Sequence, residues 1–338
     1  MRVMLAVFSD SVRLLRARKL FGISMAISLM VALFYASIGF DENGITFFFG
    51  LKKFEEPAFA AGTNESVAFY ILLFTDVIVR FWLAWVVVLL GLISAVSIFP
   101  DFLAEGSIGT TLSKPVSRVG IFLLKYLFAL GFVAVQVAIF SLVVFFALGL
   151  RIAEWNLGVF WAVPLVTFIF SLIYCVSVLL AVWTRSTAFA LLGGLGIWGV
   201  SLLMGWAEDV SYKMGVMFPE MGAEISLESG QVTDADEGAG EGARSWNETF
   251  KAIGTPFPKT RECTIYMKKL IRFEERPSLL SGVTFDMLLA GMSGDPMARQ
   301  VTEKYEQRHS LWYIFGTSAV FEAVVLGLAL FSFCRKDF

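Results

Sequence analysis

DVIVRFWLAWVVVLLGLISAVSIF, residues 76–99, contains only two charged side chains, Asp76 and Arg80, and both lie in its first five positions. The hydrocarbon core of a bilayer is about 30 Å thick, and a helix needs about 20 mostly apolar residues to cross it. A stretch of this length and composition therefore predicts a transmembrane helix.

Five further stretches have the same character, and together they define the fold class. The chain is 57% hydrophobic and 17% charged, with a mean hydropathy of +0.73, which is too apolar for one soluble core. We predict an all-α polytopic membrane protein with six transmembrane helices. Besides 76–99, the predicted spans are 20–40, 120–150, 159–183, 187–206 and 311–333. The fifth is short and rich in glycine, so a re-entrant or broken helix stays open beside a full crossing.

Charge and cysteine content exclude several classes of function. The formal net charge is −2, which offers no basic surface for nucleic acid. Cys175, Cys263 and Cys334 lie in an apolar run, a polar region and the C-terminal segment. This scatter predicts neither a disulfide framework nor a metal cluster.

The basic residues of the short loops predict the orientation, because loops rich in Lys and Arg tend to stay in the cytoplasm. They fall on one side of the six-span arrangement, so we expect both termini to be cytoplasmic. The N-terminal 19 residues resemble an interfacial amphipathic helix more than a cleavable signal. The residues that set the orientation are Arg13, Arg16, Arg18, Lys19, Lys114, Arg118, Lys125, Arg185, Arg335 and Lys336.

Three regions follow from this layout. Residues 1–206 hold the interfacial helix, spans one to five and a cytoplasmic segment at 100–119. Residues 207–310 form an external region, in which the acidic, Gly-rich stretch 220–250 predicts disorder and 251–309 predicts short amphipathic helices. Residues 311–338 hold span six and a cytoplasmic tail.

The cytoplasmic segment between spans two and three contains EGSIGTTLSKPVSR, residues 105–118. On composition alone it is a solvated turn between two helices. Its residue order, however, resembles the motif of ABC-2 type permeases, the membrane subunits of ATP-binding-cassette exporters. Gly109, Thr110 and Thr111 depart from that motif and weaken helix propensity. The residues singled out as the coupling segment are Glu105, Gly106, Ser113, Lys114, Pro115, Ser117 and Arg118.

The resemblance implies a function and a set of partners. A permease of this kind is driven by a separate ABC ATPase subunit, which binds the ATP and Mg²⁺, and it works with a second permease copy or paralogue in the bacterial cytoplasmic (inner) membrane. The chain itself contains no phosphate-binding loop, so we expect no enzymatic activity and no cofactor of its own. From a different class of function, a membrane-anchored scaffold or maturation factor with a partner-binding external region remains an alternative.

Polar residues inside the predicted spans form a second group of candidates. A charge at membrane depth costs roughly 3 kcal/mol unless it is paired or hydrated. Arg80 could form a structural ion pair with Asp76 or Glu322, or these side chains could line a substrate path, together with Gln136 in span three. The intramembrane candidates are therefore Asp76, Arg80, Gln136 and Glu322.

Overall fold

The computed structural model describes residues 19–103, 117–229, 245–273, 278 and 308–336, and for residues 215–229 only the backbone. It confirms the all-α polytopic fold, because six helices are long and apolar enough to cross a membrane. Their bounds are Leu20–Ser37, Asn64–Phe102, Arg118–Ile152, Leu157–Thr184, Thr187–Met214 and Trp312–Arg335.

The fourth span is the centre of the bundle. It consists of a short 3-10 turn, η4 (Leu157–Trp161), and α8 (Ala162–Thr184). Within its most apolar window 72% of residues are buried, against 17% for the last span, which is made of η5 (Trp312–Gly316) and α14 (Thr317–Arg335). Around α8 pack α7 (Arg118–Ile152), α9 (Thr187–Ser229) and α14. The outer helices thus present much of their apolar surface away from the bundle, as lipid-facing helices do.

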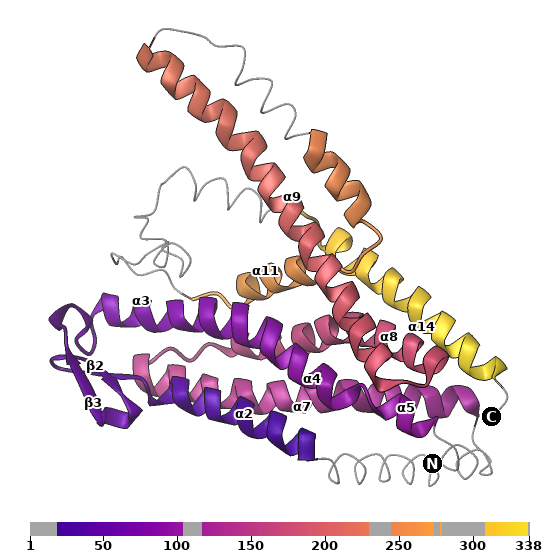
Figure 1. The fold of residues 1–338 in the computed structure, drawn as a ribbon. Helices are drawn as coiled ribbons and strands as arrows, with labels where there is room; N and C mark the ends of the chain where they lie inside the picture. Colours follow the sequence, from indigo (N-terminus) through magenta and orange to yellow (C-terminus); the bar gives the residue numbers. More distant parts are fainter. Residues whose placement is uncertain (1–18, 104–116, 230–244, 274–277, 279–307, 337–338) are drawn as a thin grey trace.

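The two ends of the bundle differ in structure, as Figure 1 shows. One end carries a small antiparallel sheet of β1 (Gly39–Asp41), β2 (Gly44–Phe47) and β3 (Lys52–Glu55), in that order. It follows α2 (Lys19–Ser37), and we call it the sheet end. At the other end α7 begins and α8 and α14 finish, and we call this the Arg118 end.

The second span is longer than the sequence predicted. It begins at Asn64 instead of 76 and runs through α3 (Asn64–Leu72), the π-helical segment η3 (Leu73–Val87), α4 (Val88–Ala95) and α5 (Ile98–Phe102). Thr63 caps its start, because its hydroxyl accepts a hydrogen bond from Ser66 N at 3.2 Å. A π-helix of 15 residues is unusual, since most are single turns inside α-helices.

The fifth span is a continuous helix. α9 starts at Thr187 and extends to Ser229 without a break, so the boundary expected at residue 206 falls inside it. It packs closely on α8: a Cβ on Gly194 would lie 2.2 Å from Ser177 Oγ. Residues 220–229 of the predicted disordered stretch belong to this helix, and 230–244 lie outside the described residues.

Two elements of the region after α9 pack against the bundle. Residues 245–254 are helical, and α11 (Thr260–Leu270) is the amphipathic helix that the spacing predicted, with Cys263 and Met267 buried. α11 packs against η3, α8 and α9. It therefore closes over the spans instead of standing apart from them (Figure 1).

Candidate functional site

Ser117 and Arg118, the described residues of the 105–118 motif, lie at the Arg118 end of the bundle. Of the predicted coupling residues, Glu105, Gly106, Ser113, Lys114 and Pro115 lie outside the described residues. Ser117 is the N-cap of α7: its hydroxyl accepts a hydrogen bond from Gly120 N at 3.1 Å. The last motif positions therefore lead without a break into a 35-residue helix.

Arg118 connects this helix start to the last span. Its Nη1 donates to the carbonyl of Cys334 at 3.1 Å and to that of Lys336 at 2.9 Å. These carbonyls lie at the end of α14, where helix carbonyls lack partners within the helix and attract cations. The start of α7 and the end of α14 are thus held together by one guanidinium.

Lys336 extends the same connection to the central helix. Its Nζ donates to the carbonyls of Val182 and Trp183, at 2.6 and 3.2 Å, near the end of α8. Burial lowers the pKa of Lys336 below its ordinary value, and the charge of Arg185 lowers it further. Together with Arg118, this side chain joins the ends of α8 and α14 to the start of α7.

Glu322 lies in the middle of the last span and is bound by neutral hydroxyls. Its Oε1 accepts a hydrogen bond from Tyr126 Oη at 2.7 Å, and its Oε2 accepts one from Ser171 Oγ at 3.1 Å. Tyr126 belongs to α7 and Ser171 to α8, so the carboxylate joins three helices. Hydrogen bonds to a charged group contribute about 1.5–3 kcal/mol each, which helps to offset the cost of its depth.

Gln136 makes the corresponding contact with the first span. Its Nε2 donates to Ser28 Oγ at 2.7 Å, and both side chains are buried between α7 and α2. The expected intramembrane polar role of Gln136 is therefore a helix-to-helix contact, at a different place from Glu322.

The two charges of the second span have separate surroundings. Asp76 is buried and forms an ion pair with Lys268 of α11. Arg80, one turn further along η3, is exposed. Asp76 is thus paired with Lys268, and Glu322 accepts hydrogen bonds from two hydroxyls.

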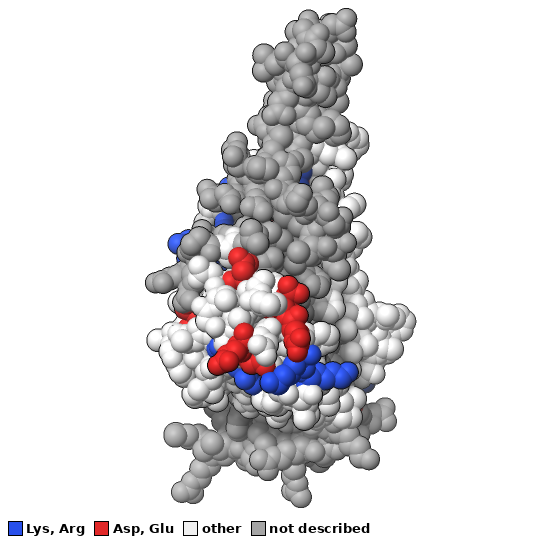
Figure 2. Space-filling view, turned by 90° about the vertical axis from the view of Figure 1, so that its left-hand side faces the viewer, with Lys and Arg blue, Asp and Glu red and all other residues white. Residues whose placement is uncertain are grey.

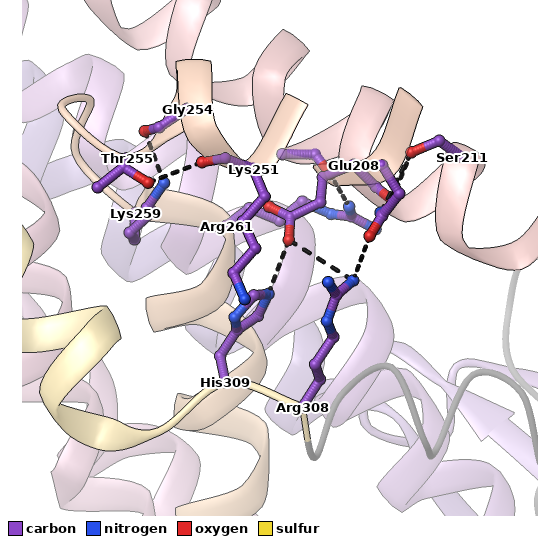
Figure 3. Close-up of polar contacts among 11 residues, drawn as sticks. Glu208, Ser211, Lys251, Gly254, Thr255, Lys259, Arg261, Arg308 and His309 are labelled. Carbon is purple, nitrogen blue, oxygen red and sulfur yellow. Dashed lines mark hydrogen bonds and ion pairs between the residues drawn. The ribbon is translucent and has the colours of Figure 1, made fainter. Parts of the chain in front are cut away.

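A buried polar cluster that the sequence analysis missed lies where α9 leaves the spans. We call it the Glu208 cluster, and Figure 3 shows most of it. His309 Nε2 lies 3.1 Å from Glu208 Oε1, and Arg308 Nη1 lies 3.9 Å from the same oxygen. Its members are Glu208, Asp209, Asn247, Lys259, Arg261, Arg308 and His309.

The cluster joins four segments that are far apart in sequence. Asn247 Nδ2 donates to the Glu208 carbonyl at 2.8 Å and, through its Oδ1, accepts from Arg308 at 2.6 Å. Arg261 of α11 pairs with Asp209 at 2.5 Å and donates to the Gly205 carbonyl. The network therefore fixes α9, residues 245–254, α11 and the segment before η5 to one another.

Lys259 and Glu262 complete the surroundings at the start of α11. Lys259 Nζ donates to the carbonyl of Gly254 at 2.6 Å (Figure 3). Its backbone N donates to Ser318 Oγ at 3.0 Å. Burial raises the pKa of Glu262 above its ordinary value, against the opposing effects of its own backbone N–H, Lys259 and Arg261. Burial thus disfavours the charged form of this carboxyl.

The geometry of the Glu208 cluster indicates a structural role. Its basic groups pair with carboxylates or donate hydrogen bonds to carbonyls inside the network. Buried charges are tolerated when they have such partners. Within the part of the chain that the structure describes, no group of three His, Cys, Asp or Glu side chains could hold a metal ion. His309, the single histidine of the sequence, stacks on Tyr313 at a ring distance of 4.8 Å.

Comparisons with known proteins do not extend this description. No protein-family model matches the chain, and no curated protein matches it in sequence.

Proposed function

We propose that this chain is the transmembrane permease subunit of an ABC transporter of the ABC-2 type, which exports a substrate when a separate ATPase subunit binds and hydrolyses ATP. The observation that carries the proposal is the 105–118 motif and its continuity with the bundle. The last two motif residues are Ser117, the N-cap of α7, and Arg118, its first residue. Arg118 donates hydrogen bonds to two carbonyls at the end of α14.

This continuity supports a coupling role on mechanical grounds. A force on 105–118 would act on the second span at Phe102 and on the third span at Ser117. Because Arg118 and Lys336 join α7, α14 and α8 at the same end, the force would reach four of the six spans. Phe102 and Phe122 also both contact Phe333 of α14, with ring centroids 6.0 and 5.6 Å apart.

The proposal assigns an orientation and partners. The Arg118 end faces the cytoplasm of a bacterial cell and binds the ATPase, which supplies the ATP and Mg²⁺ sites. The sheet end faces the outside of the cytoplasmic membrane. A second copy of this chain, or a paralogue, completes the permease, because the ATPase subunits of such exporters work as a pair.

The test uses the intact chain purified in mild detergent together with its co-purifying ATPase. Glu105→Ala and Lys114→Ala are the informative variants, because Arg118→Ala would also remove the two bonds to the end of α14. Losing a charge-assisted contact costs about 1.5–3 kcal/mol, so we expect association to weaken about tenfold or more. ATP hydrolysis by the assembly should fall in parallel.

Glu42→Ala is the matched control, because Glu42 is an exposed acid in the turn between β1 and β2 at the opposite end. It should assemble and hydrolyse ATP like the parent. The proposal is wrong if no ATPase subunit accompanies the chain, or if Glu105→Ala and Lys114→Ala behave like the Glu42 control.

One observation favours the scaffold as a second candidate function. α9 continues 23 residues beyond residue 206, where the sequence places the end of the fifth span, which adds about 34 Å of helix on the far side of the membrane from Thr187. A helix of that length could present a partner-binding surface. A chain that purifies without any ATPase, but with a stable partner held by this region, would favour the scaffold.

A further inference from the structure

The turn between β2 and β3 exposes an unusual amount of apolar surface. It reads FFFGL, residues 47–51, and continues with Lys52 and Lys53. Leu51 is 86% exposed and Phe49 is 67% exposed, and Phe48 is exposed as well. Turns in water favour Gly, Asn, Asp, Pro and Ser, so this composition calls for an apolar environment.

The backbone of the turn is also held in a rare conformation. Phe48 and Phe49 have φ angles of 52° and 57°, in the left-handed region that bulky side chains seldom adopt. Such strained residues persist where the surroundings impose them, and they concentrate at functional positions. Here the strain turns successive phenyl rings outward at the tip of the hairpin.

The tip is continuous with the lipid-facing surface of the first span. The ring of Phe48 contacts that of Phe34 in an edge-on arrangement, with centroids 5.7 Å apart. Phe34 belongs to an exposed apolar stripe of α2 that also contains Met30 and Leu33. In Figure 1 the sheet accordingly lies beside the end of α2.

Arg151, at the end of α7, fixes the position of the hairpin. Its Nε and Nη2 both donate to the carbonyl of Ala36 at 3.1 Å, and its guanidinium lies over the ring of Phe49, 5.6 Å from the centroid. The tip is therefore held against the ends of two spans.

The charges of the sheet follow the order expected at a membrane surface. Apolar residues 48–51 form the tip, Lys52 and Lys53 come next, and Glu55 and Glu56 follow. Figure 2, which looks onto the sheet end, shows basic and acidic side chains grouped together there, beside uncharged ones. Lysines that directly follow an apolar tip are typical of an interfacial segment.

We propose that the β2–β3 tip inserts into the lipid leaflet at the sheet end, with Phe48, Phe49 and Leu51 among the acyl chains and Lys52 at the headgroup phosphates. The partner of this surface is the lipid itself. The inference is independent of the ATPase, because it uses only the six-span fold and the hairpin.

The experiment places a fluorescent label on the tip and measures its surroundings. Leu51→Cys is suitable, because Leu51 has an ordinary φ of −67° and its side chain is almost fully exposed. Cys334 is replaced by serine, while Cys175 and Cys263 are buried and do not label in the folded chain. Glu56→Cys, at an exposed position directly after β3, is the matched control.

The labelled chains are reconstituted in nanodiscs of phosphatidylcholine and phosphatidylglycerol, which leave both faces open to soluble reagents. Nitroxide carried on the lipid acyl chains should quench the Leu51 label severalfold more than the Glu56 label, and iodide in water should show the reverse order. Equal quenching of both labels by iodide would place the tip in water and overturn the proposal.

A second outcome would also overturn it. If the Leu51 label is shielded from both quenchers and Leu51→Cys forms a disulfide between two chains on oxidation, a second copy of the protein covers the tip instead of lipid. Folding of each variant is checked by its elution and by its unfolding transition, so a loss of signal is not mistaken for a change of environment.

Discussion

Glu322 and Glu208 are both carboxylates inside the helical bundle, but their neighbours differ in kind. Glu322, in the middle of the last span, accepts hydrogen bonds from the hydroxyls of Tyr126 and Ser171. Glu208, 21 residues along α9 from Thr187, lies with His309 and Arg308 in a network that also contains Asp209 and Arg261. That distance is about 32 Å of helix, close to the thickness of the bilayer core.

The difference follows from the solvent at each level. At the middle of the bilayer each further charge costs free energy, so a carboxylate is stabilised better by neutral hydrogen-bond donors than by additional charged groups. At the membrane boundary, water and long charged side chains can solvate and pair with carboxylates, so a network of opposite charges can form. Removing one member should therefore have different consequences at the two places.

The largest effect is expected at the boundary, for Arg261→Gln. This change leaves the buried Asp209 without its closest partner and also removes the bond to the Gly205 carbonyl. Leaving a buried charge without its ion-pair partner costs about 3–5 kcal/mol, and because Lys213 still pairs with Asp209 we expect the lower end of this range. The free energy of unfolding, followed by tryptophan fluorescence in detergent, should fall by about that amount.

Lys213→Gln is the control for Arg261→Gln, since Lys213 pairs with the same carboxylate from one turn away and is a third exposed. Its loss should cost about 0.5 kcal/mol, the usual value for exposed pairs on a helix. Equal losses for the two variants would mean that Asp209 is solvated and that the Glu208 cluster is not a buried network.

A smaller loss is expected in the middle of the membrane, for Tyr126→Phe. The change removes the 2.7 Å hydrogen bond to Glu322, which should cost about 1.5–3 kcal/mol because the acceptor is a carboxylate. Tyr174→Phe is the matched control: this buried tyrosine stacks on Tyr126 and donates to the neutral carbonyl of Ala95. A Tyr174→Phe loss as large as that of Tyr126→Phe would contradict a charged acceptor at position 322.

The smallest effect concerns pH and the start of α11. Burial raises the pKa of Glu262 above 4.5, so the folded chain holds this proton more tightly than the unfolded chain does. The free energy of unfolding should therefore decrease as pH rises from 4.5 through the raised pKa, by at most about 1.4 kcal/mol per pH unit. Unfolding measured across that pH range should show the decrease.

Glu262→Gln should remove this part of the pH dependence and stabilise the chain above the raised pKa. Glu56→Gln changes an exposed carboxyl directly after β3 and should leave the pH profile as it is. If Glu262→Gln and the parent lose stability in parallel as pH rises, the buried carboxyl at 262 is not the group responsible.

Hydropathy was sufficient to predict the six spans, because a span depends on the composition of about 20 consecutive residues and not on which side chains they contact. It failed at the start of the second span, which the sequence placed at residue 76. The structure instead covers Asp76 with Lys268, so the helix continues past it to Asn64. The sheet was also missed, although the Asn43–Gly44 pair is a strong hairpin signal.

The partners of the charged residues could not be predicted from the sequence. A search for opposite charges suggested Arg80 for Glu322, whereas the structure uses Tyr126 and Ser171, which are inconspicuous within apolar runs. The Glu208 cluster combines α9 with residues 247, 261 and 308–309, and no local pattern records such distant contacts. Conversely, the coupling residues 105–116 were singled out by sequence and lie outside the described part of the chain.

The unbroken course of α9 has a geometric consequence. From Thr187 to Ser229 it is 43 residues, or about 64 Å, of one helix, clamped near its middle by the Glu208 cluster. Such a helix would tilt about the Glu208 cluster, which lies near the membrane boundary. A tilt of about 5° about this point would move each end by about 3 Å in opposite directions, so a rotation at the Arg118 end would produce an equal and opposite displacement of the far end of α9.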